Sequence, residues 1–251
     1  MIRTLLTLAD EAGRAIMEIY RSDFAVEHKG DRSPVTAADR IAEEIILKGL
    51  AQLTPDISVI AEEQAAAFGL PEEIPGDFWL VDPLDGTKEF LKRNGEFTVN
   101  IALIKNKKPI LGVIHIPAEN SFYWNEENRA YHRPAHGEVK EIQTRSIPEE
   151  GAILLSSRSH GGEDFSSVIG NVKIAGEALA GSSLKFCRLA EGKADLYPRL
   201  KPTMEWDIAA GHAILEAAGG TVTLLDGSPM MYGKKNFLNP YFLARGHAAL
   251  P

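Results

Sequence analysis

Two aspartates lie three positions apart in the segment VDPLDGT, where Asp82 and Asp85 are separated by Pro83 and Leu84. The segment follows an apolar run, so both carboxylates are expected where a buried strand ends. Carboxylates that cluster repel one another and lose hydration on burial unless a proton or a cation neutralises them. Taken alone, the segment fits equally well a turn in which each aspartate hydrogen-bonds its own backbone.

Other acidic residues stand at similar positions, where strands end or helices begin. Glu62 and Glu63 follow a short apolar strand, and Asp207 opens a predicted helix. In α/β proteins such positions meet at one edge of the sheet, where ligands usually bind. Hard oxygen ligands suit Mg²⁺ or Mn²⁺, and two acids spaced as Asp82 and Asp85 suit two ions about 4 Å apart. Singly, Glu62–Glu63 is more typical of a solvated loop and Asp207 of a helix cap, so only the combination favours a metal site.

The composition is that of a globular enzyme. A formal net charge of −8 and the lack of a long basic run argue against nucleic acid as a partner. One cysteine, Cys187, precludes an internal disulfide and fits a reducing cytosol. No apolar run is long enough to span a bilayer. We therefore expect a cytoplasmic protein without a transmembrane segment; the sequence leaves open peripheral attachment to the cytoplasmic face of the inner membrane, and also the oligomeric state.

Hydrophobic periodicity predicts an α/β protein in two parts. Apolar residues recur at helical spacing between Leu5 and Ile19, and Thr36 is a candidate cap for a helix from Ala37 to Leu53. A pause near residues 145–152 predicts a boundary between an N-terminal α+β subdomain and a C-terminal α/β subdomain, 1–148 and 149–251. The predicted strands include 78–81, 97–105, 110–117, 152–157, 172–176, 194–200 and 221–225, with further helices over 182–192 and 206–220.

Four segments together resemble the inositol monophosphatase superfamily of Mg²⁺-dependent, lithium-sensitive phosphatases. They are KGDRSPVTAAD, AEEQ, VDPLDGT and EWDIAAGHAILEAAGG. The longer stretch LVDPLDGTKEFLKRNGEFTVNIALI is most similar to the 3'(2'),5'-bisphosphate nucleotidase branch, whose members remove the 3'-phosphate of adenosine 3',5'-bisphosphate (PAP), a by-product of sulfate activation. The resemblance implies a layered αβαβα sandwich, sugar-phosphatase-like, with the active site between two subdomains. It also implies two or three Mg²⁺ ions, for which Mn²⁺ can substitute, and a small-molecule nucleotide substrate, with PAPS as a further candidate.

The resemblance also implies roles for individual residues. The implied metal ligands are Glu62, Asp82, the carbonyl of Leu84, Asp85 and Asp207. Thr87 and Asp39 are the implied catalytic pair, in which Thr87 hydrogen-bonds the attacking water and passes its own hydrogen bond to Asp39. The family usually has Gly or Ser before the acidic pair, where this chain has Ala61, whose side chain is not a ligand.

Substrate contacts are implied in both halves of the chain. They are Gly86, Thr87, His160, Ser182, Lys185, Arg199 and Asp207. Lys and Arg would supply charge-assisted hydrogen bonds to phosphate, and the backbone after Gly86 would offer N–H donors. Taken singly, each has a simpler explanation, such as an exposed loop for His160 or a solvated helix face for Lys185.

Three alternatives follow from the same residues. Within the superfamily, the chain could act on inositol monophosphate or a related sugar phosphate. The triplet DGT also occurs in haloacid dehalogenase phosphatases, but there the nucleophilic aspartate and the acid are two positions apart, and here the separation is three. A non-catalytic nucleotide sensor on the same scaffold would be expected to lack a carboxylate or Thr87, and this chain has them all.

Overall fold

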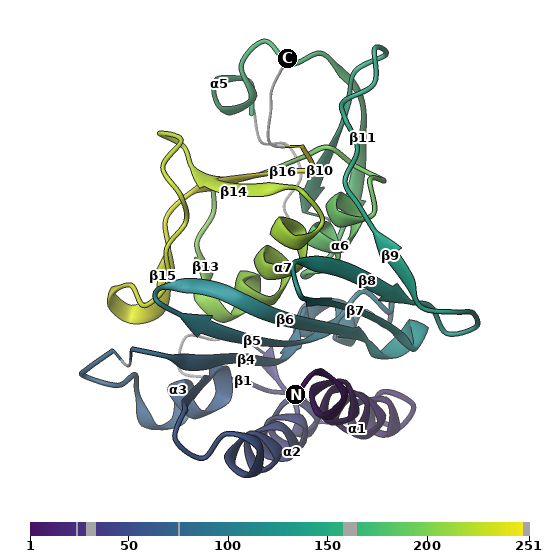
Figure 1. The fold of residues 1–251 in the computed structure, drawn as a ribbon. Coiled ribbons are helices and arrows are strands. Elements are labelled where there is room, and N and C mark those ends of the chain that lie inside the picture. The colour runs from purple at the N-terminus through teal and green to yellow at the C-terminus, as the bar shows by residue number, and fades with distance from the viewer. Residues whose placement is uncertain (24, 29–33, 75, 158–164, 248–251) are drawn as a thin grey trace.

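The computed structural model describes residues 1–23, 25–28, 34–74, 76–157 and 165–247. It contains two main sheets separated by helices (Figure 1). The first has the strand order β3-β4-β5-β6-β7-β8-β9, in which only β3 and β4 run parallel. Its strands are β3 (Ser58–Ala61), β4 (Phe78–Asp85), β5 (Thr98–Lys105), β6 (Lys108–Ile116), β7 (Ser121–Glu126), β8 (Arg129–Arg133) and β9 (Lys140–Ile142).

Helices α1 (Ile2–Tyr20) and α2 (Ala37–Leu53) pack together on one face of this sheet (Figure 1). Their apolar stripes are buried against strand residues such as Trp79 and Ile101. Thr36 caps α2 as expected: its hydroxyl accepts from the N–H of Ala38, while the Asp39 carboxylate accepts from the backbone N–H of Thr36. The predicted N-terminal helices are therefore confirmed, with α2 over the expected range.

The opposite face of the sheet is covered by α6 (Leu184–Ala190) and α7 (Glu205–Ala217) (Figure 1). Almost every residue of α7 from Glu205 to Leu215 is buried, as expected for a helix that lies between two sheets. The second sheet has the order β11-β10-β12-β16-β14. Its strands are β10 (Ala152–Ser157), β11 (Ile174–Ala180), β12 (Leu196–Arg199), β14 (Thr221–Leu224) and β16 (Phe242–Arg245).

A short helix, α5 (Ser166–Ile169), lies beyond the second sheet, where Phe165 and Ile169 join a small apolar cluster with Ala152 and Leu196. The layer order is therefore helix, sheet, helix, sheet, helix, which confirms the expected αβαβα sandwich. One apolar cluster contains residues from both sides of position 148, including Phe78 and Phe186. The remaining elements are β1 (Glu27–His28), β2 (Pro34–Val35), α3 (Glu62–Phe68), α4 (Thr87–Leu91), β13 (Thr203–Met204), β15 (Leu238–Asn239) and the 3₁₀ turns Pro117–Glu119 and Lys235–Phe237.

Some element boundaries differ from those expected. The strand expected to end at Val81 continues as β4 to Asp85, and the strand expected over 172–176 is β11, shifted to Ile174–Ala180. Both extensions depend on pairing with distant strands, β5 and β10, which local composition does not encode. None of the described helices has the length and apolar character needed to cross a membrane.

Candidate active site

The two aspartates of VDPLDGT lie on one face of the sheet because β4 contains a bulge. Asp82 pairs with Asn100 and Asp85 with Thr98, so three steps along β4 match two along β5. Asn100 and Thr98 are two residues apart and share a face, so their partners share it as well. The extra residue also accommodates Pro83, which could not donate to a regular ladder in a central strand. The spacing of three is therefore what brings both carboxylates to the side covered by α6 and α7.

Glu62 reaches the same place through the parallel pairing of β3 with β4. The register sets Ala61 beside Val81, so the next residues along the two strands, Glu62 and Asp82, follow side by side. Glu62 is the first residue of α3, and, in addition to burial, its charge is close enough to Asp82 to raise the pKa of that carboxyl. An acidic residue in the first turn also interacts favourably with the helix dipole.

Asp207 comes from the other half of the chain, in the first turn of α7. Its Oδ2 accepts from the backbone N–H of Met204 at 2.8 Å, which fixes the carboxylate at the start of the helix. Helix α7 packs against β4, so this end of the helix lies beside the bulge. The four predicted acidic ligands, remote in sequence, are thus brought together by one strand pairing, one bulge and one helix start.

The electrostatics of this cluster fit a divalent cation. Burial raises the pKa of Asp82 well above its ordinary value, and the charges of Glu62, Asp85 and Asp207 raise it further. Burial and the charges of Asp85 and Glu62 likewise raise the pKa of Asp207, while Arg199 and the N–H of Met204 oppose the rise. Carboxylates in this environment need a positive charge close by, and hard oxygen donors suit Mg²⁺ or Mn²⁺.

The four carboxylates lie near one another, but their present arrangement does not form a complete coordination site. Among the described residues, no group of three His, Cys, Asp or Glu side chains is arranged to hold an ion by itself. Several of the carboxylate oxygens accept from protein donors instead: Asp82 Oδ1 accepts from the N–H of Leu84 at 3.1 Å. Mg²⁺ commonly keeps several waters and takes only one or two carboxylates plus substrate phosphate, so a loose carboxylate set agrees with that ion.

Thr87 and Asp39 lie beside the carboxylate cluster and contact each other. Thr87 Oγ1 is 3.3 Å from Asp39 Oδ1 and 3.4 Å from the carbonyl oxygen of Leu84, and it can donate to either. Asp39 is 2 % exposed, and its other oxygen accepts from both the N–H and the hydroxyl of Thr36. The capping of α2 therefore fixes Asp39 in the orientation in which it can receive a hydrogen bond from Thr87.

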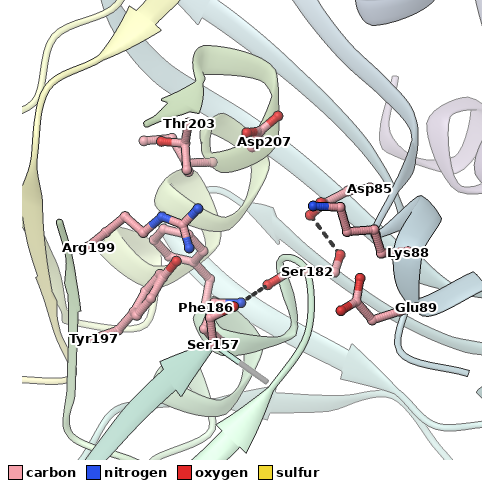
Figure 2. A pocket seen from close by; sticks show the side chains of 13 residues that line it. Asp85, Lys88, Glu89, Ser157, Ser182, Phe186, Tyr197, Arg199, Thr203 and Asp207 are labelled. Atoms are coloured by element: carbon pink, nitrogen blue, oxygen red, sulfur yellow. Dashed lines mark hydrogen bonds between the residues drawn. The ribbon is translucent and has the colours of Figure 1, made fainter. Parts of the chain in front are cut away.

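A pocket lies next to Asp85 and Asp207, and residues from both halves of the chain line it (Figure 2). Of the predicted site residues, it brings together Asp85, Gly86, Ser182, Lys185, Arg199 and Asp207. Glu62, Asp82, Leu84, Thr87 and Asp39 are not among its lining residues. Gly86 has φ +92°, and a Cβ there would lie 3.1 Å from the carbonyl of Glu96, so a larger residue would be strained at the turn after the bulge.

The two predicted cations of the pocket differ in their surroundings. Lys185 is 4 % exposed, and its ammonium donates to the carbonyls of Ala180 at 3.2 Å and Ser182 at 2.7 Å. Burial lowers its pKa to about 8. Arg199 donates from Nε to the carbonyl of Lys201 at 3.2 Å, and Figure 2 shows its guanidinium directed into the pocket. Arg199 is therefore the cation better placed to meet an anionic ligand.

Several lining residues were missed from the sequence: Lys88, Glu89, Ser157, Phe186, Tyr197, Thr203 and Ile208. Lys88 and Glu89 directly follow the GT of the motif, so their closeness to it was the available signal. Tyr197 was hidden within an apolar strand; its ring lies under the Lys185 ammonium at 5.2 Å. The predicted contact His160 falls outside the described residues.

Comparison with known proteins gives consistent matches along the chain. A model of the inositol monophosphatase family matches residues 1–249. The 3'(2'),5'-bisphosphate nucleotidase CysQ of Salmonella typhimurium is 46 % identical over 245 residues, which cover 96 % of this chain and 98 % of that protein. The protein of the same name from Escherichia coli K12 is 45 % identical with the same coverage.

Solved structures show the same fold. A crystal structure of CysQ from Bacteroides thetaiotaomicron, described as a bacterial member of the inositol monophosphatase family, is 38 % identical with a TM-score of 0.77. The match covers 97 % of this chain and 96 % of that one. The Thermotoga maritima IMPase is 26 % identical with a TM-score of 0.76, covering 98 % and 91 % of the two chains.

Proposed function

Because the chain belongs to the inositol monophosphatase family, we propose that it is a Mg²⁺-dependent 3'(2'),5'-bisphosphate nucleotidase that hydrolyses the 3'-phosphate of PAP to give AMP and phosphate. The observation that carries the proposal is the composition of one pocket, which is lined by the carboxylates Asp85 and Asp207 and by the cations Lys185 and Arg199. Such a pocket can hold a cation-bound phosphate at one side and a second, free phosphate at the other.

The acidic residues can be divided between two metal ions. Glu62 and Asp82 would hold one ion, and Asp82, Asp85 and Asp207 a second, with the carbonyl of Leu84 as a further ligand. Bound there, Mg²⁺ supplies Lewis-acid polarisation of a phosphoryl oxygen and lowers the pKa of water. Because Asp82 is buried among other carboxylates, its charge is most fully neutralised when the site is loaded.

Thr87 and Asp39 would orient the attacking water. Thr87 can donate to Asp39 and at the same time accept from a water through its remaining lone pair. Asp39 is held by the helix cap and keeps the Thr87 hydroxyl in one rotamer. The pair then directs a water lone pair towards phosphorus, and no covalent intermediate is needed.

Arg199, together with Lys185, would receive the second phosphate of the nucleotide. The guanidinium is directed into the pocket and presents planar donors suited to a phosphate. Lys185 adds positive charge, although two of its three donors already bind carbonyls. This part of the site is the expected source of preference for a bisphosphate over a monophosphate. The location we propose is the cytoplasm, which the single cysteine supports.

A phosphate-release panel tests the proposal. PAP, PAPS, inositol 1-phosphate and fructose 1,6-bisphosphate are compared at equal concentration with Mg²⁺, and again with EDTA. We expect PAP to have the highest kcat/KM and EDTA to abolish release. Predominant turnover of inositol phosphate would assign the chain to the other branch of the family, and undiminished release in EDTA would refute metal dependence.

A trapping experiment separates this scheme from one with a covalent nucleophile. Rapid acid quenching during turnover of ³²P-labelled PAP should leave no label on the protein. A labelled aspartyl-phosphate at Asp82 or Asp85 would overturn the direct attack of water.

A further inference from the structure

Ser183 links the two halves of the proposed metal site. It lies just before α6 and is 2 % exposed. Its Oγ is 2.9 Å from Asp85 Oδ2, at the end of β4, and 2.8 Å from the backbone carbonyl oxygen of Asp207, in α7. One hydroxyl thus contacts two of the proposed ligand residues, which are 122 positions apart in the sequence.

The hydrogen bonds around the Ser183 hydroxyl indicate that it donates its proton to Asp85. Asn100 Nδ2 donates to Ser183 Oγ at 2.8 Å, so the hydroxyl proton is left for an acceptor. The available acceptors are the Asp85 carboxylate and the Asp207 carbonyl, and a carboxylate is the stronger of the two. Ser183 therefore accepts from Asn100 and donates to Asp85, while Asn100 Nδ2 also lies 3.5 Å from the same Asp85 oxygen.

Asp85 is held by further neutral donors. Ser182 Oγ donates to the same Oδ2 at 2.7 Å and also contacts Thr98 Oγ1 at 2.6 Å. Thr98, Asn100 and Ser183 are each at most 2 % exposed. These hydroxyl and amide groups fix one carboxylate oxygen without adding charge.

We infer that Ser183 is a positioning residue for Asp85: it fixes Oδ2 so that the other carboxylate oxygen is presented to the divalent cation. The inference rests on the proposed function, because it concerns how that metal site is assembled. Hydrogen-bond partners of metal ligands orient the ligand and raise metal affinity, typically by about 10–100-fold. Ser183 is not itself a pocket-lining residue. Its side chain contacts the proposed ligand residues Asp85 and Asp207 and not the cations Lys185 and Arg199, so its main effect should be on metal binding.

The test is Mn²⁺ affinity measured by calorimetry on the full chain without nucleotide. Ser183→Ala should weaken Mn²⁺ binding by about 10-fold or more, and Ser183→Thr, which keeps the hydroxyl, should restore most of the affinity. Ser121→Ala is the matched control. Ser121 is on β7, and the variant removes a buried hydroxyl that lies 2.8 Å from Nε2 of His132 on β8, away from the pocket. It should bind Mn²⁺ as the unmodified chain does.

A second measurement separates positioning from general stability. Melting temperatures in EDTA report the fold of the metal-free chain, and KM for PAP at saturating Mg²⁺ reports nucleotide binding. A positioning role predicts that Ser183→Ala lowers metal affinity beyond what Ser121→Ala does, at similar melting temperature in EDTA and similar KM. A double variant with Asn100→Ala should weaken Mn²⁺ binding by less than the product of the two single effects, because Asn100 and Ser183 hydrogen-bond each other and act on the same oxygen of Asp85.

The outcomes distinguish this inference from the proposed function. Equal Mn²⁺ affinity of Ser183→Ala and the unmodified chain would overturn the positioning role and leave the phosphatase proposal intact. A lowered melting temperature in EDTA with unchanged affinity would do the same. No Mn²⁺ binding by the unmodified chain would overturn the metal scheme itself, and the positioning role with it.

Discussion

Thr87 Oγ1 lies 3.3 Å from Asp39 Oδ1, across 48 positions of sequence, and the contact joins the turn after β4 to the first turn of α2. The same aspartate closes the capping box of its helix. The helix cap and the proposed catalytic pair are thus one hydrogen-bonded unit. Changes at Asp39, which helps to cap α2, should affect both stability and turnover, whereas changes at Thr87 should affect mainly turnover.

Thr87→Ala should lower kcat on PAP by about 100-fold or more and leave KM nearly unchanged, because general acid–base positioning typically contributes about 10²–10⁴-fold. Thr87→Ser keeps the hydroxyl and should recover much of the loss. Steady-state kinetics at saturating Mg²⁺ checks both. If the alanine variant turned over at the normal rate, Thr87 would have no part in orienting water.

Asp85→Asn should lower metal affinity and kcat/KM by about 100-fold or more, since even outer partners of metal ligands cost about 10–100-fold. Circular dichroism should show the fold retained. Asp226→Asn, an exposed aspartate in the turn after β14, is the control and should behave normally. Unchanged metal affinity in Asp85→Asn would exclude Asp85 as a ligand.

Arg199→Ala should raise KM for PAP by about 10- to 100-fold, because hydrogen bonds to charged groups contribute about 1.5–3 kcal/mol. Adenosine 3'-phosphate, which lacks the 5'-phosphate, should show little change in KM. The exposed Arg129, changed to Ala, is the matched control. An equal rise in KM for both nucleotides would mean that Arg199 does not read the second phosphate.

We predict that Glu43 makes the free energy of unfolding depend on pH. It is 5 % exposed on α2, where its Oε2 accepts from the N–H of Glu63 at 2.8 Å, and burial raises its pKa from 4.5 to about 7. Between pH 4.5 and about pH 7, Glu43 keeps its proton in the folded chain but has lost it in the unfolded chain. The free energy of unfolding therefore falls as the pH rises through this range. Glu43→Gln does not titrate and should show a smaller loss of stability between pH 5 and pH 8.

Urea denaturation in EDTA at the two pH values measures this loss. The comparison between the two proteins isolates Glu43, because the other carboxylates titrate in both. The same loss in Glu43→Gln and the unmodified chain would show that Glu43 makes no contribution to the pH dependence.

Much of the fold was predictable where local signals are strong. Thr36 marked the start of α2. The acidic residues expected at strand ends and at a helix start, Glu62, Asp82, Asp85 and Asp207, lie close together in the structure, and their role as metal ligands stays a prediction. The bulge was not predictable, because it exists only in the pairing of β4 with β5. It nevertheless explains why three positions, and not two, separate Asp82 from Asp85.

The hydrogen-bond partners of the proposed ligands could not be predicted from the sequence either. GSSLK contains two serines, and the resemblance assigned only the first; the part of Ser183 emerges when α6, β5 and α7 meet. Lys185 is predicted to lie at the phosphate, and nothing in the sequence indicated that its ammonium also donates to the carbonyls of Ala180 and Ser182. Such contacts depend on tertiary packing between segments that are remote in the chain.

The proposed reaction requires four acidic side chains that share divalent cations. A crystal soaked in Mn²⁺ and measured at the manganese absorption edge tests this most directly. We predict anomalous density between the carboxylates of Glu62, Asp82, Asp85 and Asp207. Anomalous density only at other positions, in a crystal of protein that hydrolyses PAP with Mn²⁺ in solution, would contradict the shared metal site.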